Sequence, residues 1–190
     1  RDLVRSRGLG DVYKRQTVCS CGTDYFCEIS SITEDTVFLN IKEQKLCSAE
    51  PSVDLTLFQA IPKQDKLEHI IQKSVELGVS KIVPVLTRRC VSRPDKKDFE
   101  KKLVRLNKIA LEAAKQSGRG IIPTVEPMIS FDEAIIQMKE YDCPAMLYEE
   151  GGIRFSELNT QEKKSFALFV GSEGAVSYTH LRAHETVLDL

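Results

Sequence analysis

The chain contains no apolar run that approaches the roughly 20 residues needed to cross a bilayer, and its N-terminus lacks the apolar stretch of a signal peptide. We therefore expect a cytoplasmic protein. The net charge is only −1, so no global positive field indicates nucleic-acid binding, and any RNA contact must come from a local patch. With 42% hydrophobic and 29% charged residues, the 190-residue chain is typical of one or two soluble globular domains.

Motifs for metals and nucleotides are also missing. The six cysteines have no paired CxxC spacing and are expected to be reduced thiols: Cys19, Cys21, Cys27, Cys47, Cys90 and Cys143. His69 has neither a nucleophile nor a second histidine to complete a triad or a metal site, so we expect it to be an exposed side chain. No P-loop occurs, which disfavours a cradle for nucleotide phosphates. We expect no metal.

The two ends differ from the middle of the chain. Residues 1–16 (RDLVRSRGLGDVYKRQ) mix charge, glycine and isolated apolar residues without a helical or strand period. Residues 176–190 (VSYTHLRAHETVLDL) are similarly detached. Both segments resemble translated sequencing-adapter sequence, so we expect them to be artefacts flanking a natural fragment from about Thr17 to Ala175.

The pattern of the middle changes near residues 47–52, where we place a domain boundary. Before it, β-rich runs at 25–29 and 36–41 flank the polar segment 30–35 and predict a hairpin, part of a small β domain at 17–50. After it, residues 51–175 alternate strands with helices, the pattern of an α/β layer.

In the α/β part, Asp65 is predicted to cap the first helix, with Glu68 completing a capping box and Gly78 ending it. Ser130 and Glu133 predict a second capping box, opening a helix that reaches about Lys139. A longer helix is expected at 98–116, and strands at 55–60, 81–86, 143–148 and 166–170. Pro84 indicates a strand end or a sheet edge.

Two groups of residues could carry chemistry. Gly171-Ser172-Glu173-Gly174 follows an apolar strand, and its glycines allow the backbone to approach a bound molecule, although such a loop is also compatible with a plain turn. Basic residues at strand and helix ends could form a local RNA-binding face, the alternative being solvated surface charges. These residues are Lys66, Lys73, Arg88, Arg89, Arg93, Lys115 and Arg119.

Four segments together resemble a known family. Residues 66–79 (KLEHIIQKSVELGV) are similar to K-M-E-x-x-I-Q-K-x-x-E-L-G-V, and 88–90 to an S-E-R-C-like element. Residues 113–119 (AAKQSGR) match A-x-x-Q-x-x-R, and 170–174 match I-G-P-E-G with Ser172 in place of proline. These are motifs of the ribosomal RNA small subunit methyltransferase E family, of the knotted SPOUT class, and the resemblance spans about Thr17 to Gly174.

The resemblance implies an α/β SPOUT domain with a C-terminal trefoil knot, preceded by a PUA-like β-barrel, in a homodimer. It implies methyl transfer from S-adenosylmethionine to uracil N3 of one uridine in 16S ribosomal RNA of the assembled small ribosomal subunit. The implied cofactor-binding residues are Leu147, Tyr148, Glu149, Gly171, Glu173 and Gly174. Those implied for RNA are Lys66, Lys73, Arg88, Arg89 and Arg119.

The chain departs from the family at both ends. A later segment of the form L-G-x-R-I-L-R-x-E-T-A, where we expect the catalytic residues and the rest of the knot, is absent, and so is the start of the barrel. We therefore expect the 190-residue chain to be inactive and its parent protein to be active. Two alternatives stay open, a non-enzymatic RNA-binding module and a SPOUT methyltransferase with another RNA target.

Overall fold

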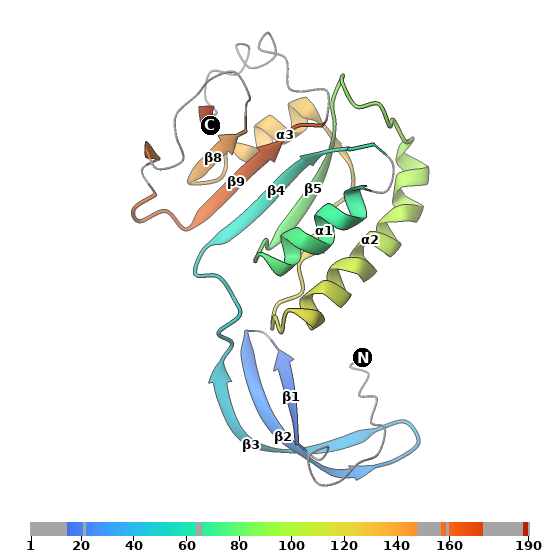
Figure 1. The fold of residues 1–190 in the computed structure, drawn as a ribbon, viewed down its shortest axis with the longest axis vertical. Coiled ribbons are helices and arrows are strands. Elements are labelled where there is room, and N and C mark those ends of the chain that lie inside the picture. The colour runs from blue at the N-terminus through green and yellow to red at the C-terminus, as the bar shows by residue number, and fades with distance from the viewer. Residues whose placement is uncertain are drawn as a thin grey trace. The chain divides into compact units, whose positions relative to one another are not determined.

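The computed structural model describes residues 15–20, 22–63, 66–147, 157–158, 160–172 and 188–189. Contacts between residues divide the chain into two compact units (Figure 1). The N-terminal unit comprises Arg1–Glu50 together with Gly118–Ile121, and the larger unit comprises Pro51–Ser117 and Ile122–Leu190. A short loop from the middle of the chain therefore belongs to the N-terminal unit.

The N-terminal unit is an antiparallel sheet of β1 (Arg15–Ser20), β2 (Thr23–Ile32) and β3 (Val37–Leu46), in that order. The hairpin predicted from the sequence is confirmed as β2 and β3. Its turn is shorter than predicted, because Ser30 Oγ donates to the Phe38 carbonyl (3.1 Å) and Ile32 pairs with Val37. The first strand begins at Arg15, two residues before the expected natural start, and Arg15 pairs with Glu28.

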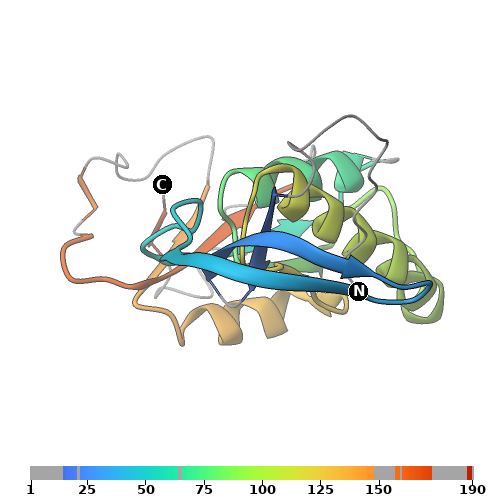
Figure 2. The same ribbon diagram turned by 90° about the horizontal axis from the view of Figure 1, so that it is seen from below.

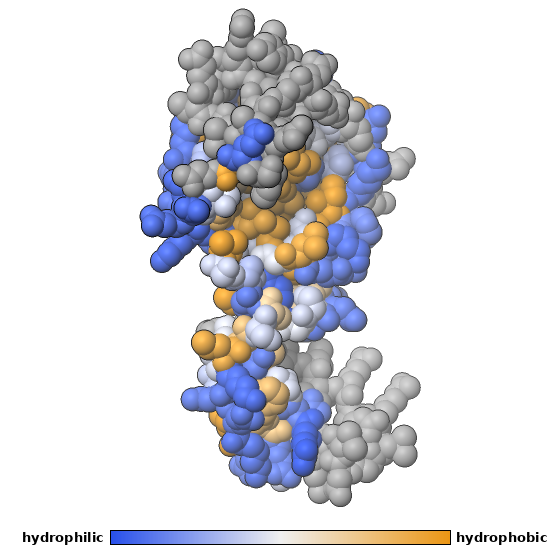
Figure 3. Space-filling view, turned by 60° about the vertical axis from the view of Figure 1, so that its left-hand side comes forward, coloured by the Kyte–Doolittle hydropathy of each residue, from blue (hydrophilic) through white to orange (hydrophobic). Residues whose placement is uncertain are grey.

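Large apolar side chains are exposed on this sheet. They are Phe26, Ile32, Val37, Phe38, Ile41 and Leu46. Figure 3 shows orange areas among blue ones in the lower half of the view. The cysteines of the described residues are free thiols. Burial, with a 2.7 Å hydrogen bond to Asp24, raises the pKa of the Cys19 thiol to about 12, so this thiol stays protonated at neutral pH.

The larger unit is built on a parallel sheet with the strand order β10-β8-β9-β4-β5-β6, in which β7 also pairs with β5. Its strands are β4 (Asp54–Ala60), β5 (Lys81–Leu86), β6 (Thr124–Val125), β7 (Ile129–Ser130), β8 (Cys143–Met146), β9 (Ser165–Val170) and β10 (Leu188–Asp189). Its helices are α1 (Lys66–Glu76), α2 (Lys96–Gln116) and α3 (Phe131–Met138). The predicted α/β layer is confirmed.

Helices cover both faces of this sheet, and the direction of the crossovers explains why. From β4 the chain passes through α1 to β5 and through α2 to β6, so it moves towards one edge of the sheet. From β7 it passes back through α3 to β8, which lies on the other side of β4. Because parallel crossovers are right-handed, reversing the direction places the helix on the opposite face. Figure 2 shows α3 across the sheet from α1 and α2.

Short-range signals for the helix ends are largely confirmed. Ser130 caps α3 in a complete capping box with Glu133. Gly78 ends α1 with φ of 104°, a conformation that suits glycine. The long helix α2 begins at Lys96, two residues before the predicted start, because Asp95 accepts a hydrogen bond from the Lys97 N–H and serves as the N-cap. Asp65, the predicted cap of α1, lies outside the described residues.

Aromatic side chains fill the core between the sheet and α3. Phe58 and Phe169 are fully buried on the adjacent strands β4 and β9. The Phe131 ring of α3 meets Phe169 edge to face, with 5.3 Å between ring centroids. Tyr141 packs likewise on Phe58, and its hydroxyl donates to the buried Thr56 Oγ1 at 3.0 Å. This core fixes β4 and β9 side by side.

Pro84 marks neither the end of its strand, which runs from Lys81 to Leu86, nor a sheet edge, so that interpretation is wrong. Its strand, β5, pairs with β4 on one side and with both β6 and β7 on the other. The residues paired with β6 are Lys81 and Ile82, and those paired with β7 are Val85 and Leu86. Pro84 falls between these pairs, where the neighbouring strand is interrupted, so its missing N–H is tolerated inside the sheet.

Candidate functional site

The carboxyl ends of β8, β9, β4 and β5 meet at one edge of the parallel sheet, the usual position of ligand sites in such folds. Leu147 follows β8 directly, and Gly171 follows β9. The Leu147 N–H donates to the carbonyl of Phe169 at 3.0 Å, which holds the two strand ends together. The structure thus brings together two of the predicted cofactor residues. The others, Tyr148, Glu149, Glu173 and Gly174, lie outside the described residues.

Gln59 also lies at this edge, and sequence reasoning did not single it out. It is the next-to-last residue of β4 and only 4% exposed. Its side-chain nitrogen donates to the Ala60 carbonyl at 2.9 Å and to the Gly171 carbonyl at 3.4 Å. The sequence did carry a signal for Gln59, namely an amide in an otherwise apolar strand end. Burying an amide is costly unless its hydrogen bonds are made, so such a residue is expected to have specific partners.

Arg88 and Arg89 lie exposed in a tight turn that follows the carboxyl end of β5. Beneath them Cys90 is buried, and its N–H donates to the Thr87 carbonyl at 3.3 Å. The Arg93 guanidinium donates to the Arg88 carbonyl at 3.2 Å and braces the turn from the other side. The exposed residues Arg88 and Arg89 therefore lie at the same edge of the sheet as Gly171.

The two predicted lysines of α1 differ in their position. Lys66 is exposed in the first turn of the helix, at the end that follows the carboxyl end of β4. Lys73 lies two turns further along and forms an ion pair with Glu76 at 2.8 Å. Lys66 therefore belongs with the arginine turn at the carboxyl edge, while Lys73 does not.

The groove between α1 and α2 is lined by carboxylates, each of which has a cationic partner. It has a volume of about 780 Å³, and its lining includes Glu68, Glu76 and Glu112 beside the exposed His69. Glu68 forms an ion pair with Arg105 of α2 at 2.8 Å. Glu76 and Glu112 are also paired, with Lys73 at 2.8 Å and Lys115 at 3.4 Å. With these cations already engaged, the groove offers no excess of positive charge to RNA phosphates. Lys73, at its border, is the weaker of the two lysine candidates.

Arg119 is not a surface residue, which corrects the interpretation that it contacts RNA. Its side chain is 2% exposed, and its Nη2 and Nε donate to the same oxygen of Glu50 at 2.8 and 3.2 Å. Glu50 also accepts the Ile121 N–H at 2.8 Å. The guanidinium therefore ties the loop 118–121 into the N-terminal unit, and it is not presented to a phosphate.

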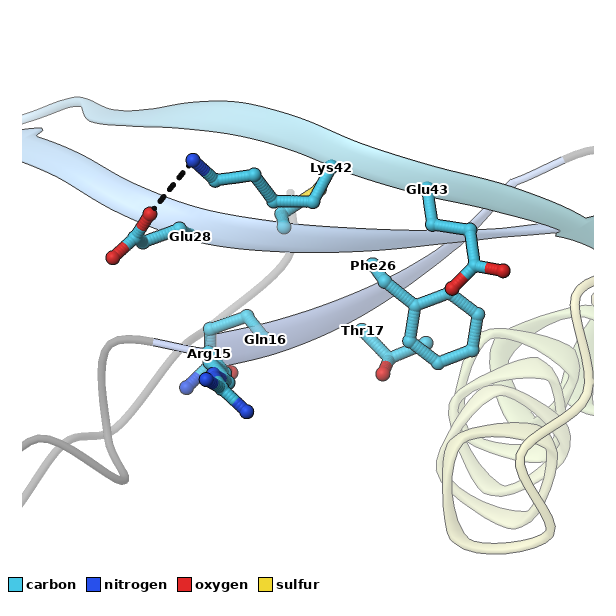
Figure 4. Close-up of a pocket in the computed structure, with 8 residues that line it drawn as sticks. Arg15, Gln16, Thr17, Phe26, Glu28, Lys42 and Glu43 are labelled. Atoms are coloured by element: carbon cyan, nitrogen blue, oxygen red, sulfur yellow. Dashed lines mark ion pairs between the residues drawn. The ribbon is translucent and has the colours of Figure 1, made fainter.

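A second hollow, of about 540 Å³, lies on the N-terminal sheet (Figure 4). Arg15 and Lys42 contribute positive charge to its lining, and Glu28 and Glu43 contribute negative charge. The dashed line in Figure 4 marks the ion pair between Lys42 and Glu28, at 3.0 Å. The balanced charges give this hollow no preference for an anion, so the carboxyl edge of the larger unit is the better candidate.

Among the residues that the structure describes, no three His, Cys, Asp or Glu side chains converge as a metal site. In the same part of the chain, no helix combines the length and the apolar character needed to span a bilayer.

The parallel α/β fold agrees with the family comparison. Residues 49–185 match the family model described as RNA methyltransferase domain. A relative from Bacillus subtilis, named ribosomal RNA small subunit methyltransferase E, is 34% identical over 172 residues, covering 85% of this chain. One of the same name from Mesomycoplasma hyopneumoniae is 30% identical over 137 residues, covering 72% of this chain. The chain belongs to the ribosomal RNA small subunit methyltransferase E family.

A solved structure gives the same result for the fold. The ribosomal RNA small subunit methyltransferase E of Neisseria gonorrhoeae, bound to S-adenosyl methionine, superposes with a TM-score of 0.75 at 26% identity, covering 90% of this chain and 71% of that one. The chain spans 67% of the length of the Bacillus relative and 59% of the Mesomycoplasma relative.

Proposed function

We propose that the full-length protein methylates uracil N3 of one uridine in 16S ribosomal RNA, with S-adenosylmethionine as the methyl donor. Family membership and the cofactor-bound Neisseria structure support the reaction class. The observation that carries the proposal to this chain is the convergence of Leu147, Gly171 and the Arg88–Arg89 turn at one sheet edge. A donor site and an RNA-binding surface would then be neighbours.

The proposed cofactor site fits the chemistry of the donor. Leu147 is 43% exposed and offers apolar surface to an adenine ring, while the strand ends offer backbone groups for its polar edge. The proposed cofactor residues are Leu147, Tyr148, Glu149, Gly171, Glu173 and Gly174. The sulfonium group of the donor supplies an already activated methyl group. The protein has mainly to align the acceptor nitrogen with it and to favour loss of the N3 proton.

The proposed RNA contacts are Arg88, Arg89 and Lys66, with Lys73 as a weaker candidate. Such cations position the protein on phosphates, and docking on the assembled small subunit would select the uridine. We also propose the rest of the family architecture for the full-length protein, namely a PUA-like barrel, a trefoil knot and a homodimer. Since ribosomes are assembled in the cytoplasm, the proposed substrate places the protein there.

The decisive experiment is complementation. The full-length gene is introduced into a bacterial strain that lacks the N3-methyluridine of 16S ribosomal RNA. Because N3 methylation blocks Watson–Crick pairing, a primer-extension stop is expected to reappear at one uridine, with N3-methyluridine found by mass spectrometry of the digested RNA. An empty vector is the control.

Other outcomes separate the alternatives. A new methyl group on a different nucleoside would identify another RNA target and overturn the assignment to uracil N3. Full-length protein that binds 16S ribosomal RNA but shows no calorimetric signal with S-adenosylmethionine would identify a non-enzymatic RNA-binding module.

A further inference from the structure

We propose that Gln59 is a positioning residue of the carboxyl-edge site, whose side-chain amide holds the carbonyl of Gly171 and thereby sets the affinity for the methyl donor. The proposal rests on the proposed function of that site. It goes beyond it by giving a role to a residue outside the four segments that resemble the family motifs, on a strand that those segments do not include.

The first argument is the cost of placing an amide at this position. Gln59 is 4% exposed, and its neighbours Phe58 and Ala60 are fully buried. An amide without partners in such surroundings would destabilise the fold, whereas leucine or methionine would fill the space without that cost. Both side-chain N–H groups are used, one on the carbonyl of Ala60 and one on that of Gly171. The amide therefore satisfies both of its N–H groups on main-chain carbonyls at this edge.

The orientation of the amide follows from its partners. Both neighbours are carbonyl oxygens, which only accept hydrogen bonds, so the nitrogen and not the oxygen of the Gln59 side chain faces them. The amide oxygen is left as an acceptor, and no described residue donates a hydrogen bond to it.

The position of Gln59 connects the amide to the site. In the sheet register Gln59 pairs with Val170, the last residue of β9, and Gly171 is the next residue. Gly171 opens the loop proposed to hold the cofactor, and its carbonyl is 112 positions away from Gln59 in the sequence. The hydrogen bond therefore fixes the start of this loop to the central strand β4, whose Phe58 and Ala60 are fully buried.

The effect expected from this contact is moderate. At 3.4 Å the bond to Gly171 is longer than the usual 2.9–3.0 Å of an N–H···O bond. Leaving the carbonyl unpaired should therefore cost near the lower end of the usual range, which corresponds to about fivefold in binding.

The test replaces Gln59 by leucine in the full-length protein and measures binding of S-adenosylhomocysteine by calorimetry. The matched control is Asn107→Leu, because Asn107 also donates its side-chain amide to a main-chain carbonyl, that of Val125, at 3.0 Å. Val125 pairs with Ile82 near the amino end of β5, away from the carboxyl edge. Both variants should lower the melting temperature, but only Gln59→Leu should weaken binding, by about fivefold.

A second readout needs no ligand. Hydrogen–deuterium exchange of the peptide covering residues 169–172 should be faster in Gln59→Leu than in wild type and unchanged in Asn107→Leu. If Gln59→Leu does not fold, Gln59→Met, which fills similar volume without N–H donors, replaces it. Equal binding and equal exchange in the Gln59 variant and the control would overturn the proposal. If the wild type binds no ligand, the proposed function fails, and the exchange experiment still decides whether Gln59 holds the loop.

Discussion

Burial, and not distance, distinguishes the ion pairs of the N-terminal unit. Glu50 and Arg119 meet at 2.8 Å with side chains 13% and 2% exposed, while Lys45 and Glu43 meet at 2.9 Å with side chains 60% and 54% exposed. Exposed pairs contribute about 0–1 kcal/mol, but removing one partner of a buried pair leaves the other charge without compensation. The first pair is therefore expected to matter for folding and the second is not.

Arg119→Met should destabilise the N-terminal unit by about 3 kcal/mol, because it leaves the Glu50 carboxylate buried beside an apolar side chain. Urea unfolding followed by the fluorescence of the tyrosines would measure this loss. Lys45→Met is the control and should change the unfolding free energy by less than about 0.5 kcal/mol. Equal effects of the two variants would show that Arg119 does not anchor its loop.

The buried pair of Glu50 and Arg119 also predicts that the stability of the fold depends on pH. Burial alone would raise the pKa of the Glu50 carboxyl, but the hydrogen bonds from Arg119 and from the Ile121 N–H outweigh it and hold the pKa below its ordinary value of 4.5. A depressed pKa stabilises the fold above the ordinary value, and this stability is lost as the pH falls through the folded-state value. In Glu50→Gln this part of the acid sensitivity should disappear.

The roles of individual charged and polar residues were only partly predictable. Arg88 and Arg119 are both arginines beside loops, and nothing local tells the exposed one from the buried one. The difference is made by Glu50, 69 positions before Arg119, which the sequence alone does not place beside it. Gln59 was overlooked for the same reason, because its partner Gly171, which follows β9, lies 112 positions later in the chain than Gln59 itself.

At the scale of single elements, helix ends were predicted well because their signals lie within four residues. The Ser130 hydroxyl accepts the Glu133 N–H, and the Glu133 carboxylate accepts the Ser130 N–H at 2.7 Å. The Ser130 N–H bond, the largest contribution, holds the pKa of Glu133 below its ordinary value. Elements that depend on distant partners were predicted less well, as Pro84 shows. The interruption between β6 and β7 that accommodates it is formed by residues 126–128, far later in the chain.

Ser130→Ala should remove the N-cap of α3 and destabilise the larger unit by about 1 kcal/mol. Thermal unfolding followed by circular dichroism would measure the change. Ser130→Asp is the matched variant, because aspartate is an equally good N-cap and its charge suits the positive end of the helix dipole. An equal loss of stability in both variants would mean that the hydroxyl contributes through something other than capping.

At the scale of the whole molecule, the chain passes between the two units three times, after Glu50, after Ser117 and after Ile121. The expected boundary at residues 47–52 rests on a local change from β-rich to alternating pattern. The assignment of 118–121 to the N-terminal unit has no such signal, since Ser117-Gly118-Arg119-Gly120 reads as an ordinary loop after a helix. It follows from packing, because a Cβ on Gly120 would approach the Gly22 backbone to 3.3 Å.

The overall charge of the chain leads to a prediction about the salt dependence of RNA binding. Because the net charge is −1, RNA affinity must depend on a local set of cations, and its salt dependence counts the phosphates they neutralise. In the full-length protein, Arg88→Gln with Arg89→Gln should reduce the steepness of log K against log salt by about 1.5 while leaving S-adenosylhomocysteine binding unchanged. The control removes two exposed charges of α2, Lys101→Gln with Lys108→Gln. Filter binding to 16S ribosomal RNA at several salt concentrations measures both slopes, and the same slope in both double variants would exclude the arginine turn as the RNA contact.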